Sequence, residues 1–217
     1  MNPAEAGAGF CSYRHPQTGE AAHDRRDPLA EAQLSFVEPA AQLRPPRCGE
    51  ALAILEIGFG WGINTATALR HLDSLQFQGS VQAQGFEPNP EWLEPWPAVP
   101  DRLQGWTPWW GGGKNRWQLP GHPWQGEILS LAFPAGLESM PVTGFDWIFL
   151  DLFSPRRHPE DWSAELFAAL AKVARPGAAL TSYCCARRIR QALGEVGWQV
   201  QRLRRRGHRD TLQALWR

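Results

Sequence analysis

Three glycines at alternate positions behind an acid form the segment of this chain whose spacing best suits ligand binding. The segment reads Glu56-Ile57-Gly58-Phe59-Gly60-Trp61-Gly62, and it follows an apolar run over residues 51–57. A helix-like pattern over residues 63–72 comes next, so the sequence predicts a strand, a tight turn and a helix N-terminus. Glycine lets the backbone come close to a ligand, and the first turn of a helix offers free N–H groups. We therefore expect this turn to bind a ligand.

The spacing of these glycines differs from the dinucleotide fingerprint G-x-G-x-x-G and from the phosphate loop, which needs Gly-Lys-Ser/Thr. It resembles motif I of the class I S-adenosylmethionine (SAM) methyltransferases, E/D-x-G-x-G-x-G. The resemblance implies SAM as the cofactor, with Gly58, Gly60 and Gly62 against it. Glu56 would hold the loop or meet the cofactor's ammonium group through water. The alternative is an ordinary glycine-rich turn between a strand and a helix.

Two more acids stand near the ends of predicted strands, where an open parallel sheet binds its ligands. Glu87 ends the predicted strand 81–87, and we expect it to accept hydrogen bonds from ribose hydroxyls. Glu127 is expected near the end of the third strand, close to an adenine amino group. The alternative for each acid is a strand-end residue with no ligand.

A third acid, Asp151, follows the dense apolar run 145–150. A carboxylate there would lie next to the reactive sulfonium and could orient an amine nucleophile or accept its proton. The alternative is an aspartate that only caps a loop. Phe153 is expected to form a wall for the substrate base, and Pro155 to fix the turn. Tyr183, at the end of the next predicted strand, is expected at the pocket mouth, with packing alone as the alternative.

Strands and helices alternate along the chain, which predicts right-handed βαβ units and a mostly parallel sheet. We expect strands at 51–57, 81–87, 145–150 and 178–183, and helices at 63–72, 159–174 and 186–196. Arg175-Pro176-Gly177 is expected to separate the helix 159–174 from the strand that follows. Segments 198–203 and 211–216 would pair as a C-terminal antiparallel hairpin. The fold class is therefore α/β and Rossmann-like, as in the class I SAM-dependent methyltransferases.

We expect residues 1–50 to be an N-terminal extension that packs on the core, and residues 51–217 to be the methyltransferase domain. A segment rich in tryptophan, proline and glycine over about 92–124 interrupts the alternation. It is expected to be an irregular insertion whose aromatic side chains pack on the sheet. The alternative is a base-stacking surface, with Lys114 and Arg116 beside it.

The composition favours a cytoplasmic protein of one sizeable α/β core in its 217 residues. No apolar run approaches the ~20 residues that a membrane span needs. The first residues lack the basic region and apolar core of a signal peptide. The four cysteines have no C-x-x-C spacing, so we expect a reducing compartment and no metal site.

The net charge is zero, but the charge is unevenly distributed, because residues 187–217 hold nine arginines and only two acids. Arginine suits bidentate contact with phosphate and stacking on bases. This segment therefore favours a polyanionic partner such as nucleic acid. The alternative is a solvated charged face.

Several longer segments resemble the methyltransferase domain of the MnmC family of tRNA enzymes. Residues 145–162 are similar to the family pattern D-x-x-F-L-D-G-F-A-P-x-x-N-P-x-x-W, and residues 56–64 to E-L-G-F-G-T-G-L-N. Residues 86–90 resemble F-E-K-x-P, and the segments 29–38 and 166–177 also match. The resemblance runs over most of residues 23–210.

This resemblance implies methyl transfer from SAM to the exocyclic amine of 5-aminomethyl-2-thiouridine at the wobble position of tRNA. The product would be 5-methylaminomethyl-2-thiouridine, and Asp151 would be the catalytic carboxylate. From the charge of the arginine-rich segment, we expect Arg205 and Arg209 to contact the tRNA phosphates. Bifunctional family members carry an additional FAD-dependent oxidase domain. The chain resembles the stand-alone form, so no flavin is expected.

The chain departs from the family pattern at several places. Pro28 replaces a glycine upstream, and the tryptophan-rich segment has no counterpart in the pattern. Leu152 replaces a glycine, Trp61 replaces a threonine, and the closing segment 207–212 lacks the family's lysine. Two alternatives therefore stay open. One is a methyltransferase of the same fold that acts on a small-molecule or protein amine. The other is a non-catalytic module that binds SAM or RNA.

Overall fold

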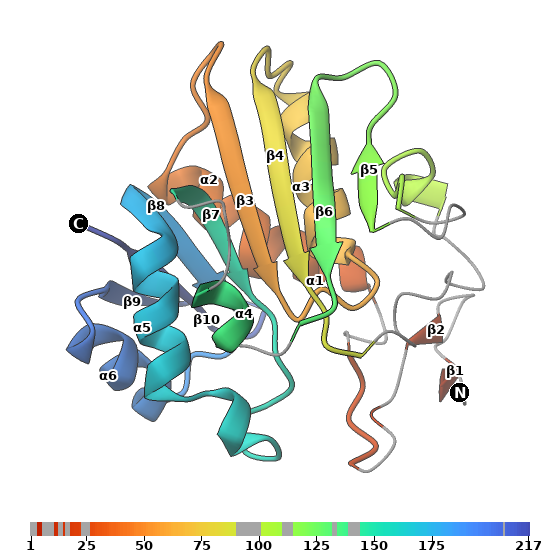
Figure 1. The fold of residues 1–217 in the computed structure, drawn as a ribbon. Helices are drawn as coiled ribbons and strands as arrows, with labels where there is room; N and C mark the ends of the chain where they lie inside the picture. The colour runs from red at the N-terminus through yellow and green to blue at the C-terminus, as the bar shows by residue number, and fades with distance from the viewer. Residues whose placement is uncertain are drawn as a thin grey trace.

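A mixed sheet of eight strands forms the centre of the computed structural model (Figure 1). The structure describes residues 4–5, 11–12, 15, 18–22, 27–89, 101–109, 115–131, 134–138, 144–205 and 207–217. The strand order is β5-β6-β4-β3-β7-β8-β10-β9. The strands are β3 (Ala51–Ile57), β4 (Ser80–Phe86), β5 (Arg116–Gln118), β6 (Trp124–Leu129), β7 (Phe145–Leu150), β8 (Ala174–Ser182), β9 (Gln199–Leu203) and β10 (Thr211–Leu215). A short antiparallel pair, β1 (Ala4–Glu5) and β2 (Cys11–Ser12), stands apart from this sheet.

The five central strands, from β6 to β8, are parallel. From β3 the chain passes to β4 and β6 on one side, and it then returns to β7 and β8 on the other side. Ligands of open α/β sheets bind at such a reversal of strand order, outside the carboxyl ends of the strands. The hairpin of β9 and β10 closes the sheet, and both of its strand pairings are antiparallel. The predicted α/β architecture with a C-terminal hairpin is therefore confirmed.

Helices cover both faces of the sheet (Figure 1). One face carries α1 (Pro28–Ala32), α2 (Glu38–Leu43) and α3 (Ile63–Ser74), and the other carries α4 (Ala135–Glu138), α5 (Ala164–Val173) and α6 (Arg187–Glu195). A π-helical turn, Gln33–Val37, joins α1 to α2, and short 3-10 turns lie at Asp101–Leu103 and Pro159–Asp161. None of the helices in the described part of the chain is long and apolar enough to cross a membrane.

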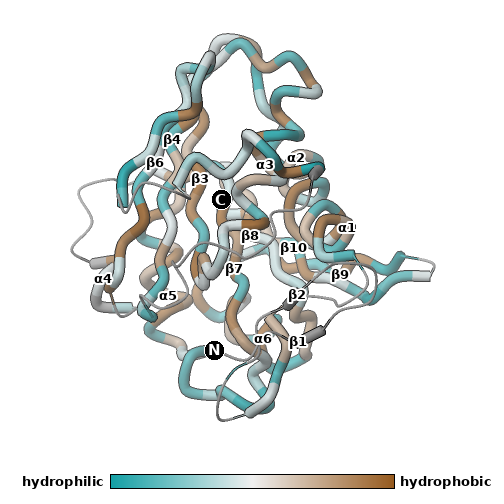
Figure 2. The backbone as a smooth tube through the Cα atoms, turned by 90° about the vertical axis from the view of Figure 1, so that its right-hand side faces the viewer, coloured by the Kyte–Doolittle hydropathy of each residue, from teal (hydrophilic) through white to brown (hydrophobic). Residues whose placement is uncertain are grey.

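Successive side chains of a strand point to opposite faces, so the central strands supply two core layers at once. In β3, Ile54 packs on the α3 side and Leu55 on the α5 side, and neither is exposed. All six residues of β7 are buried. Both strands are largely brown in Figure 2, as expected of parallel strands that are covered on both faces.

The carboxylate of Asp146 fixes the opposite, amino-terminal edge of this sheet. It is fully buried and lies 3.0 Å from guanidinium nitrogens of both Arg44 and Arg175. It also accepts a hydrogen bond of 2.9 Å from the backbone N–H of Ala53. Segments from α2, β3, β7 and β8 are thereby joined through one acid.

The predicted bounds of β3 and β7 agree with the structure, whereas the start of β8 was predicted wrongly. The helix before it does end, at Val173, but β8 begins at Ala174 and includes Arg175-Pro176-Gly177. Ala174 pairs with Phe145, and Ala179 pairs with Trp147, so β8 has extra residues at a bulge. A bulge leaves residues outside the ladder, and a proline without an N–H is tolerated there.

The tryptophan-rich insertion packs on the sheet where it is described. Trp109, Trp117 and Trp124 are buried in the core layer on the α3 face, which confirms the packing expected of them. Trp92, Trp96, Trp110 and Lys114 lie outside the described residues. In the expected N-terminal extension, α2 contacts β8 and β10, and α1 contacts α3. A domain boundary at residue 50 stays a prediction.

Candidate active site

The glycine-rich turn between β3 and α3 has three glycines with positive φ, and they differ in the space around them. Gly58, Gly60 and Gly62 have φ values of +79°, +50° and +71°, which L-residues rarely adopt. A Cβ on Gly58 would lie 2.2 Å from the carbonyl oxygen of Asp151, and one on Gly62 would lie 2.4 Å from the Phe59 ring. A Cβ on Gly60 would meet no atom of the described residues within 4 Å. Two glycines therefore allow close packing, while the third leaves the backbone open to a ligand.

Glu56 lies inside the protein and contacts the first turn of α3, directly after the glycines. Its side chain is buried, and it accepts hydrogen bonds from Asn64 Nδ2 at 2.9 Å and from the Thr65 backbone N–H at 3.0 Å. The Thr65 hydroxyl donates a third bond to it. Burial raises the pKa of Glu56 to about 7, against the opposing effect of these bonds. Glu56 thus holds the first turn of α3, as one of the two predicted roles requires.

Glu87 directly follows β4 and reaches the same turn from the neighbouring strand. It is 2% exposed, and it accepts hydrogen bonds from the backbone N–H of Gly60 at 2.8 Å and of Asn89 at 3.0 Å. Burial raises its pKa to about 7. The carboxylate therefore lies at the carboxyl edge of the sheet, beside the open side of Gly60. A ribose-binding acid in this fold would stand at this position.

Asp151 follows β7 and lies against the glycine-rich turn. Its backbone N–H donates to the Ile57 carbonyl at 2.9 Å, and its Oδ2 accepts a hydrogen bond of 2.7 Å from Asn64 Nδ2. Burial, together with the nearby charges of Glu31 and Glu56, raises the pKa of Asp151 well above its usual range, while the Asn64 bond lowers it. The site thus gathers several carboxylates around the end of β7.

The segment after Asp151 is fixed by residues that are distant in the sequence. Ser154 donates to the Glu20 carboxylate through its backbone N–H at 3.0 Å and through its hydroxyl at 2.9 Å. The indole of Trp162 donates to the carbonyl of Phe153 at 2.7 Å. The loop that was predicted to face the substrate is therefore held at two successive residues.

Aromatic rings pack together beside this loop. The Phe153 ring lies 5.0 Å from the ring of His15 and 5.4 Å from that of His158, and the two imidazoles are 4.4 Å apart. Among the described residues, His158, Glu160 and Asp161 also offer ligand atoms within 4.8 Å of one another that could hold a metal ion.

Tyr183 and Pro155 also make hydrogen bonds beside the loop that follows Asp151. The Tyr183 hydroxyl donates to the Leu152 carbonyl at 2.7 Å, and burial beside the charge of Asp151 raises its pKa. The Pro155 carbonyl accepts a hydrogen bond from Arg188 in the first turn of α6. Asp151, Phe153, Pro155 and Tyr183 are thus brought to one edge of the sheet, where the sequence predicted them.

Comparison with known proteins shows what the chain is similar to. The family model of S-adenosyl-L-methionine-dependent methyltransferases matches residues 125–216. MNMC2 from Aquifex aeolicus superposes with a TM-score of 0.83 at 23% identity, over 98% of this chain and 69% of that one. The tRNA 5-methylaminomethyl-2-thiouridine biosynthesis bifunctional protein MnmC of Nitrosospira multiformis is 29% identical over 216 residues, which is 90% of this chain. The MnmC protein of Aromatoleum aromaticum is 31% identical over 201 residues, or 85% of this chain.

The chain is MnmC-like. Its fold is that of the class I SAM-dependent methyltransferases, and SAM is the cofactor that the family and the fold imply. The chain spans about a third of the length of the MnmC proteins named above, 34% and 30% respectively.

Two of the predicted contact residues of the MnmC-like chain have partners within the protein. Glu127 lies inside β6 rather than at its end, and it pairs with Arg116 of β5 at 3.0 Å. Arg205 pairs with Glu38 at the start of α2 at 2.7 Å. Arg209 is exposed in the turn between β9 and β10. The adenine contact of Glu127 and the phosphate contacts of Arg205 and Arg209 stay predictions.

The two bulky departures from the MnmC pattern have side chains that point into the core. Trp61 is 9% exposed and belongs to the core layer on the α3 face. Leu152 is 6% exposed and packs in the other layer. Neither of these larger side chains therefore extends into solvent at the edge of the glycine-rich turn.

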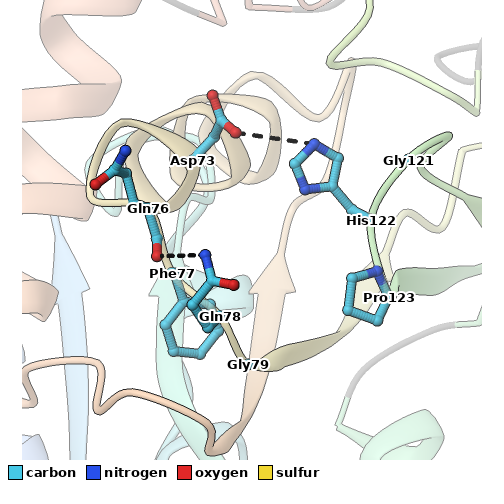
Figure 3. Close-up of a pocket in the computed structure, with 8 residues that line it drawn as sticks. All are labelled: Asp73, Gln76, Phe77, Gln78, Gly79, Gly121, His122 and Pro123. Atoms are coloured by element: carbon cyan, nitrogen blue, oxygen red, sulfur yellow. Dashed lines mark hydrogen bonds and ion pairs between the residues drawn. The ribbon is translucent and has the colours of Figure 1, made fainter.

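A separate pocket lies at the other end of α3 (Figure 3). Residues 73, 76–79 and 121–123 line it, and an ion pair of 3.8 Å joins Asp73 to His122 across it. These residues precede β4 and β6, so the pocket opens at the amino-terminal edge of the sheet. It is remote from the carboxyl ends, where Glu87 and Asp151 lie.

Sequence reasoning missed three polar residues of the candidate site. Asn64 could have been found, because it is the second residue of the helix that follows the glycines. Glu31 lies in the first turn of α1, within the segment that resembled the family. Glu20 gave no signal, since it lies in an irregular segment and contacts Ser154 across 134 positions of sequence.

Proposed function

We propose that this chain transfers a methyl group from SAM to an amine, and that the amine is the aminomethyl group of the modified wobble uridine in tRNA. The observation that carries the amine assignment is the carboxylate-rich surrounding of Asp151. Glu31 and Glu56 act on Asp151 as nearby negative charges, and Asp151, Glu20 and Glu31 act in the same way on Tyr183. A cationic sulfonium, and an amine that arrives as an ammonium ion, would each stabilise the ionised form of these buried acids, so a carboxylate-rich site suits both.

The residues at the glycine-rich turn fit SAM. Glu87 would accept hydrogen bonds from the ribose hydroxyls, and the open side of Gly60 would let the cofactor approach the backbone. Gly58 and Gly62 would keep the turn in place, with Glu56 at its base and Glu127 assigned to the adenine amino group. When bound, SAM supplies a methyl group on positively charged sulfur, whose C–S bond breaks as the new N–C bond forms, with the electron pair kept on sulfur.

The protein's own part in the reaction is to hold the nucleophile and its proton. An amine attacks only when its nitrogen has a free electron pair, so the ammonium must first lose a proton. The Asp151 carboxylate would accept that proton and orient the nitrogen. Phe153, Pro155 and Tyr183 would form the wall for the base, and the loop that carries Phe153 and Pro155 would exclude water. Alignment of the reacting atoms contributes most of the rate gain in such a direct transfer.

The tRNA assignment rests on the names of the similar MnmC proteins and on the basic C-terminal segment. Arg209 is exposed, and Arg204 beside the Glu38-paired Arg205 is exposed too. These arginines would contact tRNA phosphates, which predicts strong salt dependence of binding. A tRNA substrate also supports a cytoplasmic location. We assign to this chain only methyl transfer, and no flavin chemistry.

The deciding experiment incubates the purified protein with methyl-labelled SAM and bulk tRNA from cells that lack the wobble methyltransferase. Digestion to nucleosides and chromatography then identify the labelled product. Label in 5-methylaminomethyl-2-thiouridine is the expected result. Binding of SAM without transfer to any tRNA would overturn the substrate, and label in added small-molecule or protein amines would replace it.

A further inference from the structure

Asn64 stands between two carboxylates that belong to different parts of the site. Its Nδ2 donates to Glu56 Oε1 at 2.9 Å and to Asp151 Oδ2 at 2.7 Å. A side-chain amide has two N–H groups on that nitrogen, and both are used here. Because carboxylates accept hydrogen bonds, the amide must present its nitrogen, and its orientation is thereby fixed.

Glu56 also holds the start of α3 through bonds that do not involve Asn64. It accepts from the Thr65 backbone N–H at 3.0 Å and from the Thr65 hydroxyl, so one of the free N–H groups of the first turn is satisfied without Asn64. What Asn64 adds is the bond to Asp151, which is 87 positions away in the sequence.

The backbone of Asp151 is fixed, but its carboxylate depends on Asn64. The Asp151 N–H donates to Ile57, and its carbonyl lies against Gly58, where a Cβ would come within 2.2 Å. These contacts leave the rotation of the side chain undetermined. Among the described residues, Asn64 is the hydrogen-bond donor to this carboxylate, and Oδ1 accepts no such bond.

We propose that Asn64 is a positioning residue for the methyl transfer: it holds Asp151 through Oδ2, so that Oδ1 meets the nitrogen of the amine. Glu56 holds Asn64 in turn, and the three residues link the cofactor turn to the catalytic carboxylate. The proposal rests on the proposed function.

The charges around Asp151 give this contact a measurable signature. Glu56 on β3 and Glu31 on α1 raise the pKa of Asp151, as burial does, and Tyr183 after β8 lies close by with Glu20. The Asn64 bond opposes them, because it stabilises the ionised carboxylate. Removal of the bond must therefore raise the pKa of Asp151. A proton acceptor with a higher pKa is ionised only at higher pH, so the acid limb of the rate profile must move to higher pH.

The test replaces Asn64 with leucine, which has a similar size and no N–H. We expect kcat to fall about 10- to 100-fold, with the KM for tRNA and the Kd for SAM within about two-fold of wild type. The acid limb of kcat against pH should move upward. Thr65→Val is the matched control, because it removes a bond to the same Glu56 without touching Asp151. We expect this control to lower thermal stability and to leave the acid limb in place.

Two further measurements keep the proposal testable. In an Asp151→Asn background the added loss from Asn64→Leu should vanish, because Asn64 acts through Asp151; a full, additive loss would overturn the proposal. The carboxyl titration of Asp151, followed by NMR of protein labelled at the aspartate carboxyl carbons, needs no substrate. An equal Asp151 pKa in wild type and Asn64→Leu would also overturn it. If the leucine variant does not fold, Asn64→Ser replaces it in both measurements.

Failure of the proposed function would look different. If wild-type protein transfers no methyl group to tRNA, the tRNA reaction is excluded. The titration alone then decides whether Asn64 controls the Asp151 carboxylate.

Discussion

The cofactor turn and the substrate wall lie at the same edge of the sheet, but they are assembled differently. The cofactor turn consists of residues 56–65 with Glu87, and the substrate wall consists of residues 151–158 with Glu20 and Tyr183. Apart from the Asn64–Asp151 bond, which joins the two regions across 87 positions, the bonds of the cofactor turn span short stretches of chain, 8 positions from Glu56 to Asn64 and 27 from Gly60 to Glu87. The wall depends on the contact of Glu20 with Ser154 across 134 positions.

This difference indicates which of the two regions can change its structure while the other stays the same. A turn that is fixed by neighbours in sequence keeps its shape when distant segments vary. A wall that is held by a distant segment changes shape when that segment changes. We therefore expect substitutions in the wall to alter the substrate step and to leave cofactor affinity unchanged.

The largest effect is expected at the junction of the two regions. Asp151→Ala removes the proton acceptor, and methyl transfer should fall by about 10³-fold or more. SAM affinity, measured by calorimetry, should stay near the wild-type value. Transfer at the normal rate would remove Asp151 from the mechanism.

The next prediction breaks the cofactor turn alone. Gly60→Trp fills the space that is open at that position, so we expect the Kd for SAM to rise about 100-fold. Gly105→Trp is the matched control, because Gly105 also has positive φ and open space around its missing Cβ. The control should bind SAM normally, and normal binding by Gly60→Trp itself would refute the assignment of the turn.

A smaller effect is expected when the wall alone is loosened. Glu20→Gln weakens both bonds to Ser154, and we expect kcat to drop about ten-fold with unchanged SAM affinity. Ser154→Ala should give a similar loss, and the double variant should lose little more. Glu165→Gln, on the exposed side of α5, serves as the control. A parallel loss of SAM affinity in Glu20→Gln would contradict the separation of the two regions.

The basic segment provides a test of the tRNA partner. Arg209→Ala should weaken tRNA binding a few-fold and reduce the slope of log K against log salt by about 1, which is the signature of one lost phosphate contact. Arg205→Ala is the informative comparison, because Arg205 already pairs with Glu38. An unchanged slope in both variants would place the RNA elsewhere on the surface.

The smallest effect concerns the pH dependence of stability in the cofactor turn. The pKa of Glu87 is about 7 in the folded protein and about 4.3 in an unfolded chain, so folding favours the protonated form. The stability from this group is present below the unfolded pKa and is lost as pH rises towards about 7. Glu87→Gln imitates the protonated acid, so at pH 8 its thermal midpoint should exceed the wild-type midpoint by a few degrees. Its SAM affinity should fall, and a lower midpoint would contradict the raised pKa.

The sequence predicted best where local patterns decide the structure. The apolar runs of β3 and β7 and the glycines that follow β3 fix these elements with little outside help. The cofactor turn, Glu87 and Asp151 could therefore be placed before the structure was known.

Residues whose roles depend on pairing and distant packing could not be placed in this way. The bulge that accommodates Pro176 and Gly177 in β8 arises from the register against β7, which no local pattern encodes. Glu127 was expected at a strand end, because the insertion before it hides where β6 begins. Glu20 and the Glu38 partner of Arg205 lie too far away in sequence to be paired by inspection.

The place of β10 between β8 and β9 has a consequence for synthesis on the ribosome. The ribosome makes β9 before β10. However, β9 pairs with β10, and β10 pairs with β8, so β9 is joined to the rest of the sheet through a strand that is made later. A nascent chain that ends before Thr211 would leave β9 without its partner and the edge of β8 uncovered. Unpaired strand edges promote association between chains. We expect stalled or prematurely released chains of this length to aggregate or to be degraded.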